Sequence, residues 1–448
     1  MKWKKLSVIA LILVLAASSF HGTALAAVSA EELAEICNEL FGSVFGAPNG
    51  EPLAACQWDM AIINASDNGS YALATGEGVK VGMIDSGVDI NHPDIAPNLD
   101  LDLSCSFIFS DTPTADPMEV GNGDCSNKTA VQDINGHGTH TASTVAAPIN
   151  GIGIAGVAPE ATIVALKACT VDGFCFADSV AAALRYAGDK ELDIVNLSLF
   201  ADPYLYYCKS EAEQKAILQE LEMAAKYAQQ QGVLIVASAG NEMDDLQHPV
   251  VDEISPDWPP DTAETREVKN NCRVAPAELP GVLTVSATGP IGYPGYDMWI
   301  ASYSSVGMSV VEVAAPGGDY FSASGTVQDA VLGALPVGSA IWNAFDPLNA
   351  FFPGLTAIDN GAGYGFLNGT SMAAPHAAGV AALVVQMHPG WSPGAVKAAV
   401  QRSAQQLPCP PDWQPLDPTD TRFVCYGEGG RTSFFGHGLV DAASAAAE

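Results

Sequence analysis

Short apolar segments alternate with alanine-rich segments of helical period along most of the chain. Several of the apolar segments are hydrophobic at every position, which is typical of parallel strands covered on both faces of their sheet. We therefore predict an α/β fold with a mainly parallel β-sheet flanked by helices. The predicted strands cover residues 79–84, 162–166, 193–197, 233–237, 282–286 and 310–313.

The clearest helix is predicted over residues 211–231, where apolar side chains recur every three or four positions. Ser210 and Glu213 have the spacing of a capping box at its start, and Gly232 follows as its end. Two long segments interrupt the alternation of strands and helices, at about residues 242–271 and 318–366. We interpret both segments as insertions.

The N-terminus has the layout of a secretory signal peptide over residues 1–26. Three lysines precede an apolar run, and the small-x-small sequence Ala24-Leu25-Ala26 follows it. An uncleaved membrane anchor is the alternative, but the run is shorter than the roughly 20 residues that cross a bilayer. We expect export, and no stable membrane insertion once the signal is removed.

Ten cysteines follow the predicted cleavage site, and an even number suits an oxidising compartment in which disulfides persist. Spacing alone does not determine how they pair. A zinc–thiolate site is disfavoured because the chain has no CxxC sequence. We expect Cys105 with Cys125, Cys169 with Cys175, Cys409 with Cys425, Cys37 with Cys56, and Cys208 with Cys272.

The chain is strongly acidic, with 51 Asp and Glu against 18 Lys and Arg and a formal charge of −33. Such a charge disfavours nucleic acid and anionic membrane surfaces as partners. Solubility outside the cell and adaptation to salt both explain it, and the composition does not distinguish them.

Four polar residues lie at the ends of predicted strands or helices, where α/β proteins bind their ligands. Asp85 follows the first strand, His137 lies between two glycines, Asn241 follows a later strand, and Ser371 begins an alanine-rich helix. Taken singly, each has a simpler interpretation as a cap, turn or packing residue. Together they supply an acid, a base, a nucleophile and an oxyanion donor.

The segments VGMIDSGVD, NGHGTHTAS, ASAGNE and NGTSMAAPHAAG resemble those of subtilisin-like serine peptidases. The resemblance extends from about Gln57 to the C-terminus and implies a three-layer subtilisin-like peptidase domain over residues 57–448. It implies a secreted serine endopeptidase that acts on protein or peptide substrates. By that resemblance, Asp85 orients the imidazole, His137 is general base and then acid, Ser371 is the nucleophile, and Asn241 donates to the oxyanion with Ser371 N–H.

His140 lies three residues after His137, a spacing that also suits a pair of metal ligands. Spacing alone leaves the two interpretations tied. The resemblance assigns the base to His137 and a packing role to His140.

The resemblance also implies a structural Ca²⁺ site, because oxygen ligands on a flexible loop suit that ion. The N-terminal ligand of such a site cannot be placed, and Ile149 stands where a polar residue is common. The matching ligands are Asp94, Asn150 and the carbonyl groups of Pro148, Ile152 and Ile154.

Substrates of such peptidases bind as an extended strand between two backbone edges. Phe200 and Val274 stand where smaller residues are usual, so we predict a narrowed pocket that prefers small or medium side chains. Residues 242–267 contain nine acidic residues and one arginine, which indicates a solvated loop or, alternatively, selection for basic substrates or extra calcium. The matching substrate-binding residues are Ser198, Leu199, Phe200, Ser238, Ala239, Gly240 and Val274.

Residues 27–56 are shorter than the pro-domain usual in secreted relatives, so they are either a reduced pro-segment or part of a domain that folds without one. We expect a monomer. The alternative function is a catalytically restrained peptide-binding protein on the same scaffold. A general esterase of the α/β-hydrolase type is disfavoured, because Ser371 lies in GTSMA and not in GxSxG.

Overall fold

The computed structural model describes residues 27–291, 297–320, 325–410, 424–427 and 430–448. The predicted signal peptide, residues 1–26, lies outside the described residues. Among the described helices, none combines the length and the apolar character needed to cross a membrane.

Eight strands of the described chain form the central sheet, in the order β12-β11-β7-β5-β2-β4-β3, with β13 also paired to β11. All pairs are parallel except β11 with β12. The mainly parallel α/β sheet is therefore confirmed. The strands are β2 Lys80–Asp85, β3 Cys105–Ser106, β4 Thr162–Lys167, β5 Ile194–Leu197, β7 Leu234–Ser238, β11 Leu283–Ile291, β12 Asp297–Ile300 and β13 Val313–Pro316.

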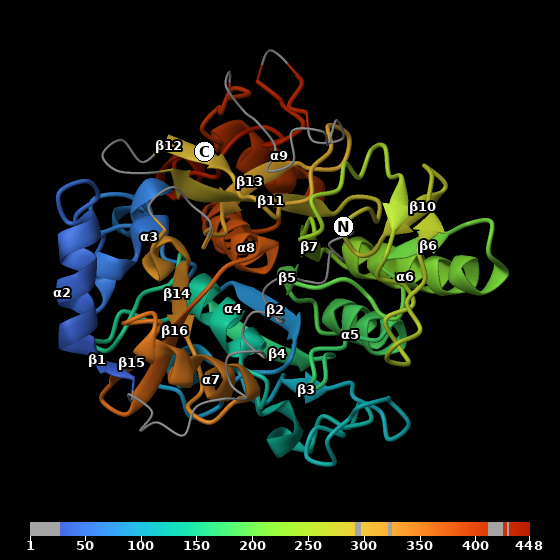
Figure 1. The fold of residues 1–448 in the computed structure, drawn as a ribbon, viewed down its shortest axis with the longest axis horizontal. Coiled ribbons are helices and arrows are strands. Elements are labelled where there is room, and N and C mark those ends of the chain that lie inside the picture. Colours follow the sequence, from blue (N-terminus) through green and yellow to red (C-terminus); the bar gives the residue numbers. More distant parts are fainter. Residues whose placement is uncertain (1–26, 292–296, 321–324, 411–423, 428–429) are drawn as a thin grey trace.

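Helices cover both faces of this sheet, which gives three layers (Figure 1). In β7, Leu234 and Val236 pack in the core beside α4 and α8, whereas Ile235 and Ala237 pack in the core beside α5 and α6. Burial on both faces explains why consecutive positions of β7, from Leu234 to Ala237, are all apolar. The helices are α4 His137–Ala146 and α8 Thr370–Met387 on one face, and α5 Ala177–Asp189 and α6 Ala212–Gln230 on the other.

Five of the six predicted strands begin within one residue of an observed strand, whereas the prediction over residues 310–313 is wrong for all but its last residue. Val310 and Val311 instead form a turn on Gly307 and pack in a separate apolar cluster. The predicted capping box is also wrong. Helix α6 begins at Ala212 after Glu211, while the Ser210 hydroxyl accepts a hydrogen bond from Asn271 at 3.2 Å.

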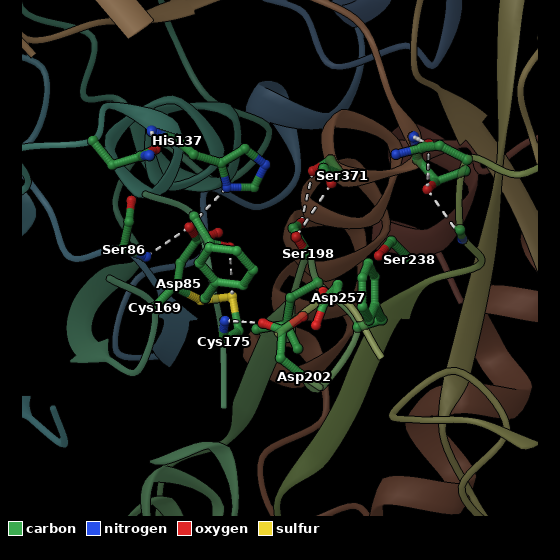
Figure 2. A pocket seen from close by; sticks show the side chains of 18 of the residues that line it. Asp85, Ser86, His137, Cys169, Cys175, Ser198, Asp202, Ser238, Asp257 and Ser371 are labelled. Atoms are coloured by element: carbon green, nitrogen blue, oxygen red, sulfur yellow. Dashed lines mark hydrogen bonds and ion pairs between the residues drawn. A yellow bond between two sulfur atoms is a disulfide. The ribbon is translucent and has the colours of Figure 1, made fainter. Parts of the chain in front are cut away.

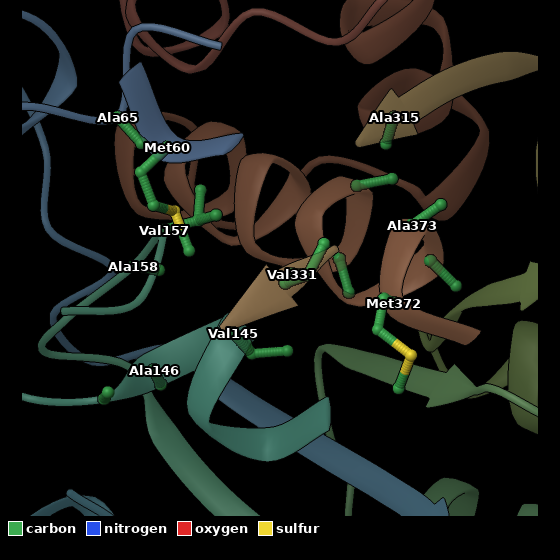
Figure 3. Packing of buried hydrophobic residues seen from close by; sticks show 14 of the residues in the cluster. Met60, Ala65, Val145, Ala146, Val157, Ala158, Ala315, Val331, Met372 and Ala373 are labelled. Carbon is green, nitrogen blue, oxygen red and sulfur yellow. The ribbon is translucent and has the colours of Figure 1, made fainter. Parts of the chain in front are cut away.

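The N-terminal segment and the second insertion fold together into a four-stranded sheet, ordered β1-β15-β16-β14 among the described residues. Helix α2, Ala30–Phe41, buries Leu33 and Phe41 in the same core as α4 and α8. Figure 3 shows Val331 of β14 between Val145 of α4 and the α8 side chains. The strands are β1 Val28–Ser29, β14 Val331–Ala334, β15 Thr356–Asp359 and β16 Ala362–Leu367.

The first insertion contains a short antiparallel pair, β8 Val251–Asp252 with β9 Arg266–Glu267. It ends in β10, Cys272–Val274, which pairs with β6, Tyr206–Cys208. This pairing places the insertion beside the segment that follows β5. The remaining helices are α3 Trp58–Ile62, α7 Ala340–Phe345, α9 Pro393–Ser403 and α10 Ala442–Ala446.

All ten cysteines lie among the described residues and form disulfides in the pairs that were expected. Four bonds close loops of 6 to 20 residues, and the bond between Cys208 and Cys272 joins β6 to β10 across 64 residues. The Cys208–Cys272 disulfide therefore fastens two strands that are also paired with each other.

Candidate active site

The fold brings the four predicted catalytic residues to one cleft with a volume of about 390 Å³ (Figure 2). Asp85 is the last residue of β2, His137 is the first of α4, and Ser371 is the second of α8. Asn241 follows β7 by three residues. The site thus lies at the carboxyl edge of the parallel sheet, where the sequence placed it.

The imidazole of His137 is oriented by Asp85, whose Oδ1 lies 2.8 Å from His137 Nδ1. The buried carboxylate also accepts hydrogen bonds from Ser86 N–H at 2.7 Å and Thr141 Oγ1 at 3.1 Å. Burial acts to lower the pKa of His137, but the carboxylates of Asp85 and Asp133 outweigh it, so this pKa is raised above its usual value. Figure 2 shows the opposite edge of the ring facing Ser371.

Asp133 fixes the start of helix α4. Its Oδ2 accepts bonds from Thr139 N–H at 2.9 Å and Thr139 Oγ1 at 2.6 Å, and its Oδ1 accepts from Ser86 Oγ at 3.0 Å. Ser86 Oγ in turn accepts from Gly138 N–H at 2.8 Å. A Cβ at Gly138 would lie only 2.1 Å from the carbonyl oxygen of Gly87, so glycine is required for this close approach.

The backbone of Ser371 is held by a hydrogen bond from outside its own helix, at a position where one helical hydrogen bond is missing. Pro375 has no N–H, so the Ser371 carbonyl lacks its helical partner and instead accepts a hydrogen bond from Ser198 Oγ at 2.7 Å. In return, Ser371 Oγ donates to the Ser198 carbonyl at 3.2 Å. The Ser371 hydroxyl must leave this carbonyl before it can donate to His137.

Asn241 is held by its oxygen, which leaves its amide nitrogen available. Its Oδ1 accepts hydrogen bonds from Thr370 N–H and Thr370 Oγ1, each at 2.9 Å. Ser371 N–H belongs to the first turn of α8, where N–H groups have no partner within the helix. Two donors of the kind that stabilise an oxyanion therefore adjoin the Ser371 hydroxyl.

His140 is fully buried and packs against the second sheet. Its Nε2 lies 3.2 Å from the Val331 carbonyl oxygen and 3.1 Å from that of Gly365, so Nε2 carries the hydrogen. Burial lowers the pKa of His140 to about 3, and the ring is therefore neutral. Within the described residues, no three His, Cys, Asp or Glu side chains are grouped so that they could hold a metal ion.

The residues expected to bind Ca²⁺ lie together, but donors face the central carboxylate. Asp94 accepts hydrogen bonds from Asn150 Nδ2 at 3.1 Å, Ile154 N–H at 3.1 Å and the Tyr364 hydroxyl at 2.8 Å. A Cβ at Gly153 would lie 2.0 Å from the Tyr364 oxygen, so this phenol fills the space inside the loop.

Calcium requires six to eight oxygen ligands that face the ion. The loop that carries Pro148 and Ile152 presents the Ile154 N–H to Asp94, and Asn150 Oδ1 already accepts a hydrogen bond from Ile152 N–H at 2.8 Å. Mainly because of burial, the pKa of Asp94 is raised to about 7. Protein donors therefore occupy Asp94 and Asn150 Oδ1 in this arrangement, and no step proposed below depends on a calcium ion.

The two predicted substrate walls line the cleft on either side of Ser371, with one exception. Ala239 is buried in an apolar cluster behind the cleft and does not line it. The residues that do line it are Ser198, Leu199, Phe200, Ser238, Gly240 and Val274.

Several lining residues were not identified from the sequence. The disulfide loop between Cys169 and Cys175 contributes Phe174, although the cysteine spacing indicated only that a loop exists there. Glu242 follows Asn241 directly, and burial raises the pKa of its carboxyl group to about 7. Asp202 and Asp257 also line the cleft, and only the acidity of the first insertion hinted at the second of them.

Comparison with known proteins agrees with this geometry. The model of the subtilase family of peptidases matches residues 76–438. Subtilisin BL of Lederbergia lenta is 29% identical over 388 residues, which cover 87% of this chain and 97% of that protein. Subtilisin E of Bacillus subtilis (strain 168) is 28% identical over 333 residues, covering 74% of this chain and 62% of that protein.

Solved structures give the same fold. A lanthipeptide protease aligns with a TM-score of 0.62 and 24% identity, covering 94% of this chain and 99% of that one. Fervidolysin from Fervidobacterium pennivorans aligns with a TM-score of 0.58 and 24% identity, and the alignment covers 89% of this chain and 46% of fervidolysin. The cleft and the three-layer fold are those of a subtilisin-like serine peptidase. The chain belongs to the subtilase family and is a serine endopeptidase that acts on peptide or protein substrates.

Proposed function

We propose that this protein hydrolyses peptide bonds through an acyl-enzyme on Ser371. The observation that carries the proposal is the 2.8 Å contact between His137 and Asp85, which orients the imidazole in the cleft that holds the Ser371 hydroxyl. Ser371 Oγ attacks the scissile carbonyl carbon while His137 Nε2 accepts its proton. Asp85 stabilises the imidazolium that forms.

The oxygen of the resulting tetrahedral intermediate accepts hydrogen bonds from Asn241 Nδ2 and Ser371 N–H. When the carbon–nitrogen bond breaks, His137 gives its proton to the leaving amine. A water molecule then attacks the acyl carbon and loses a proton to His137, and the serine regains its hydroxyl hydrogen as the carboxylic acid leaves.

A catalytically restrained peptide-binding protein is the second candidate, because Ser371 Oγ donates to the Ser198 carbonyl and not to His137. Labelling by a serine-directed phosphonate, followed by peptide mapping, distinguishes the peptidase from the restrained peptide-binding protein. Label on Ser371 together with peptide hydrolysis that is lost in Ser371→Ala supports the peptidase. Equal hydrolysis by wild type and Ser371→Ala would contradict it, and wild-type protein that binds peptides without label or turnover would favour the restrained protein.

We also propose that the protein is exported by a signal peptide over residues 1–26 and acts outside the cell as a monomer. Five disulfides and a formal charge of −33 support an oxidising, extracellular setting without nucleic-acid partners. Mass spectrometry of the secreted protein gives the cleavage site, and size-exclusion chromatography with light scattering gives the oligomeric state.

For the loop around Asp94, we infer that Tyr364 and Asn150 stabilise it in place of the calcium ion that the resemblance implies. Their hydrogen bonds to the carboxylate, at 2.8 and 3.1 Å, support this. For residues 27–56, we propose a permanent structural role, which the burial of Leu33 and Phe41 in the main core supports.

A further inference from the structure

Two carboxylic acids, Asp202 and Asp257, meet in the substrate cleft. Asp202 follows the wall that begins at Ser198, and Asp257 comes from the first insertion; both line the cleft. Figure 2 shows the pair beneath Ser198, on the side away from His137. Because His137 must face the leaving nitrogen, this part of the cleft receives the acyl half of the substrate.

Neither carboxylate is neutralised by the protein. Asp202 is only 3% exposed, and its Oδ2 accepts a hydrogen bond from Cys175 N–H. The Oδ1 atom of Asp257 is buried and has no hydrogen-bond partner. Throughout the part of the chain that the structure describes, the ion pairs join other groups and none includes either carboxylate.

Two shielded carboxylates beside each other are unstable as a doubly charged pair unless a proton or a cation joins them. Burial, followed by the side-chain hydrogen bond with Asp257 and the charge of Asp257, raises the pKa of Asp202, and burial also raises the pKa of Asp257. Both shifts favour the binding of a proton by the empty pair. A substrate cation would replace that proton and satisfy the unpartnered oxygen.

The rest of the cleft suits a long side chain with an apolar stem. Phe174, Phe200 and Val274 line it together with the acids. Phe174 packs edge-on against Trp258, the residue after Asp257, at a ring distance of 5.5 Å, which ties the disulfide loop to the insertion. An arginine or lysine side chain can lay its methylene groups on such walls and place its charge at the far end.

We propose that Asp202 and Asp257 select substrates with an arginine or lysine on the acyl side of the scissile bond. This inference rests on the proposed peptidase function and names its substrate class. It differs from the preference for small side chains that Phe200 and Val274 suggested from the sequence. It also gives the acidic first insertion a direct contact with substrate through Asp257.

The test uses fluorogenic tetrapeptides in which arginine or citrulline occupies each of the four acyl-side positions in turn. Citrulline has nearly the shape of arginine without its charge, so the ratio of the two kcat/KM values reports the charge contact alone. We expect wild-type protein to prefer arginine by at least about 30-fold at one position. Asp257→Asn should reduce that ratio by about tenfold or more, and Asp202→Asn should act in the same direction.

Glu253→Gln is the matched control. Glu253 is an exposed acid of the same insertion, and its replacement removes one negative charge outside the cleft. Its ratio should equal that of wild type. A wild-type ratio below about 3 at every position, or an Asp257→Asn ratio equal to wild type, would overturn the proposal.

Binding of the same peptides to the Ser371→Ala protein, followed by fluorescence anisotropy, separates this inference from the catalytic one. Tighter binding of the arginine peptide that depends on Asp257 supports the carboxylate pair even when wild-type protein hydrolyses nothing. Equal affinity for both peptides refutes substrate selection by Asp202 and Asp257, even when the wild-type protein hydrolyses peptides.

Discussion

The replacement Tyr364→Phe tests whether the protein itself holds the Asp94 loop. It removes one hydroxyl and leaves the ring in place, so the loss is confined to the 2.8 Å hydrogen bond between Tyr364 and Asp94. Asp94 is fully buried and would keep only its bonds from Asn150 and Ile154.

The size of the effect depends on the charge of Asp94. A hydrogen bond to an ionised group contributes about 1.5–3 kcal/mol, against about 1 kcal/mol for a neutral one. The pKa of Asp94 is raised to about 7, so the folded protein binds more protons than the unfolded chain between about pH 4 and 7. Asp94 therefore contributes stability that is present at low pH and is lost as the pH rises toward 7.

The Tyr364 hydroxyl lowers the pKa of Asp94 and so opposes that loss. Its own pKa is raised by burial and by Asp94, which keeps the phenol protonated. We expect Tyr364→Phe to lower the free energy of unfolding by about 2–3 kcal/mol at pH 9, where Asp94 is ionised, and by about 1 kcal/mol at pH 5. Urea unfolding at the two pH values measures the difference.

Tyr71→Phe is the matched control, because the Tyr71 hydroxyl donates at 2.8 Å to a neutral acceptor, the Gly156 carbonyl. Its cost should be about 1 kcal/mol at both pH values. We further expect a chelator to leave the unfolding midpoint of wild-type protein unchanged. A cost for Tyr364→Phe that does not vary with pH would refute the role of Asp94 ionisation, and a chelator-induced loss of wild-type stability would show that calcium binds.

Three further results are expected. Asn241→Ala should lower kcat about 10²–10³-fold with little change in KM, because its amide donates mainly to the transition-state oxyanion. The acidic limb of the kcat/KM profile should lie above pH 6.5, because the carboxylates of Asp85 and Asp133 outweigh burial and raise the pKa of His137. In Asp85→Asn this limb should shift to lower pH, and activity should fall about 10⁴-fold. Asp59→Ala should cost about 3–5 kcal/mol in urea unfolding, because it breaks the fully buried pair with His376, whose Nε2 lies 2.9 Å from Asp59; a loss under 1 kcal/mol would contradict that estimate.

The sheet and the meeting of the four candidate catalytic residues in one cleft were predictable because they depend on local sequence. A strand covered on both faces is apolar along most of its length, as β7 is from Leu234 to Ala237, and that pattern is visible without the fold. Asp85 and Ser371 were recognisable because each follows or begins such an element inside a long, specific motif. Their convergence follows from the shared carboxyl edge of parallel strands.

What the sequence did not reveal depends on contacts between distant segments. Tyr364 and Asp94 are 270 residues apart in the sequence, and no local pattern predicts that the Tyr364 phenol fills the loop around Asp94. Nothing in the local sequence indicates that Asp202 and Asp257 meet, because only the folded insertion places both of them in the cleft. The predicted capping box at Ser210 was wrong: helix α6 begins one residue later, with Glu211 as its N-cap, and the Ser210 hydroxyl accepts a hydrogen bond from Asn271 at the far end of the insertion.

The disulfide between Cys37 and Cys56 determines what a cut in the N-terminal segment can release. Helix α2 carries Cys37, and β1 just before it pairs with β15 of the second sheet. Cleavage of any peptide bond between the two cysteines would leave a two-chain protein whose smaller piece stays attached through sulfur. A fragment cut there would separate on a gel only after reduction, so maturation that frees this segment must cut beyond Cys56.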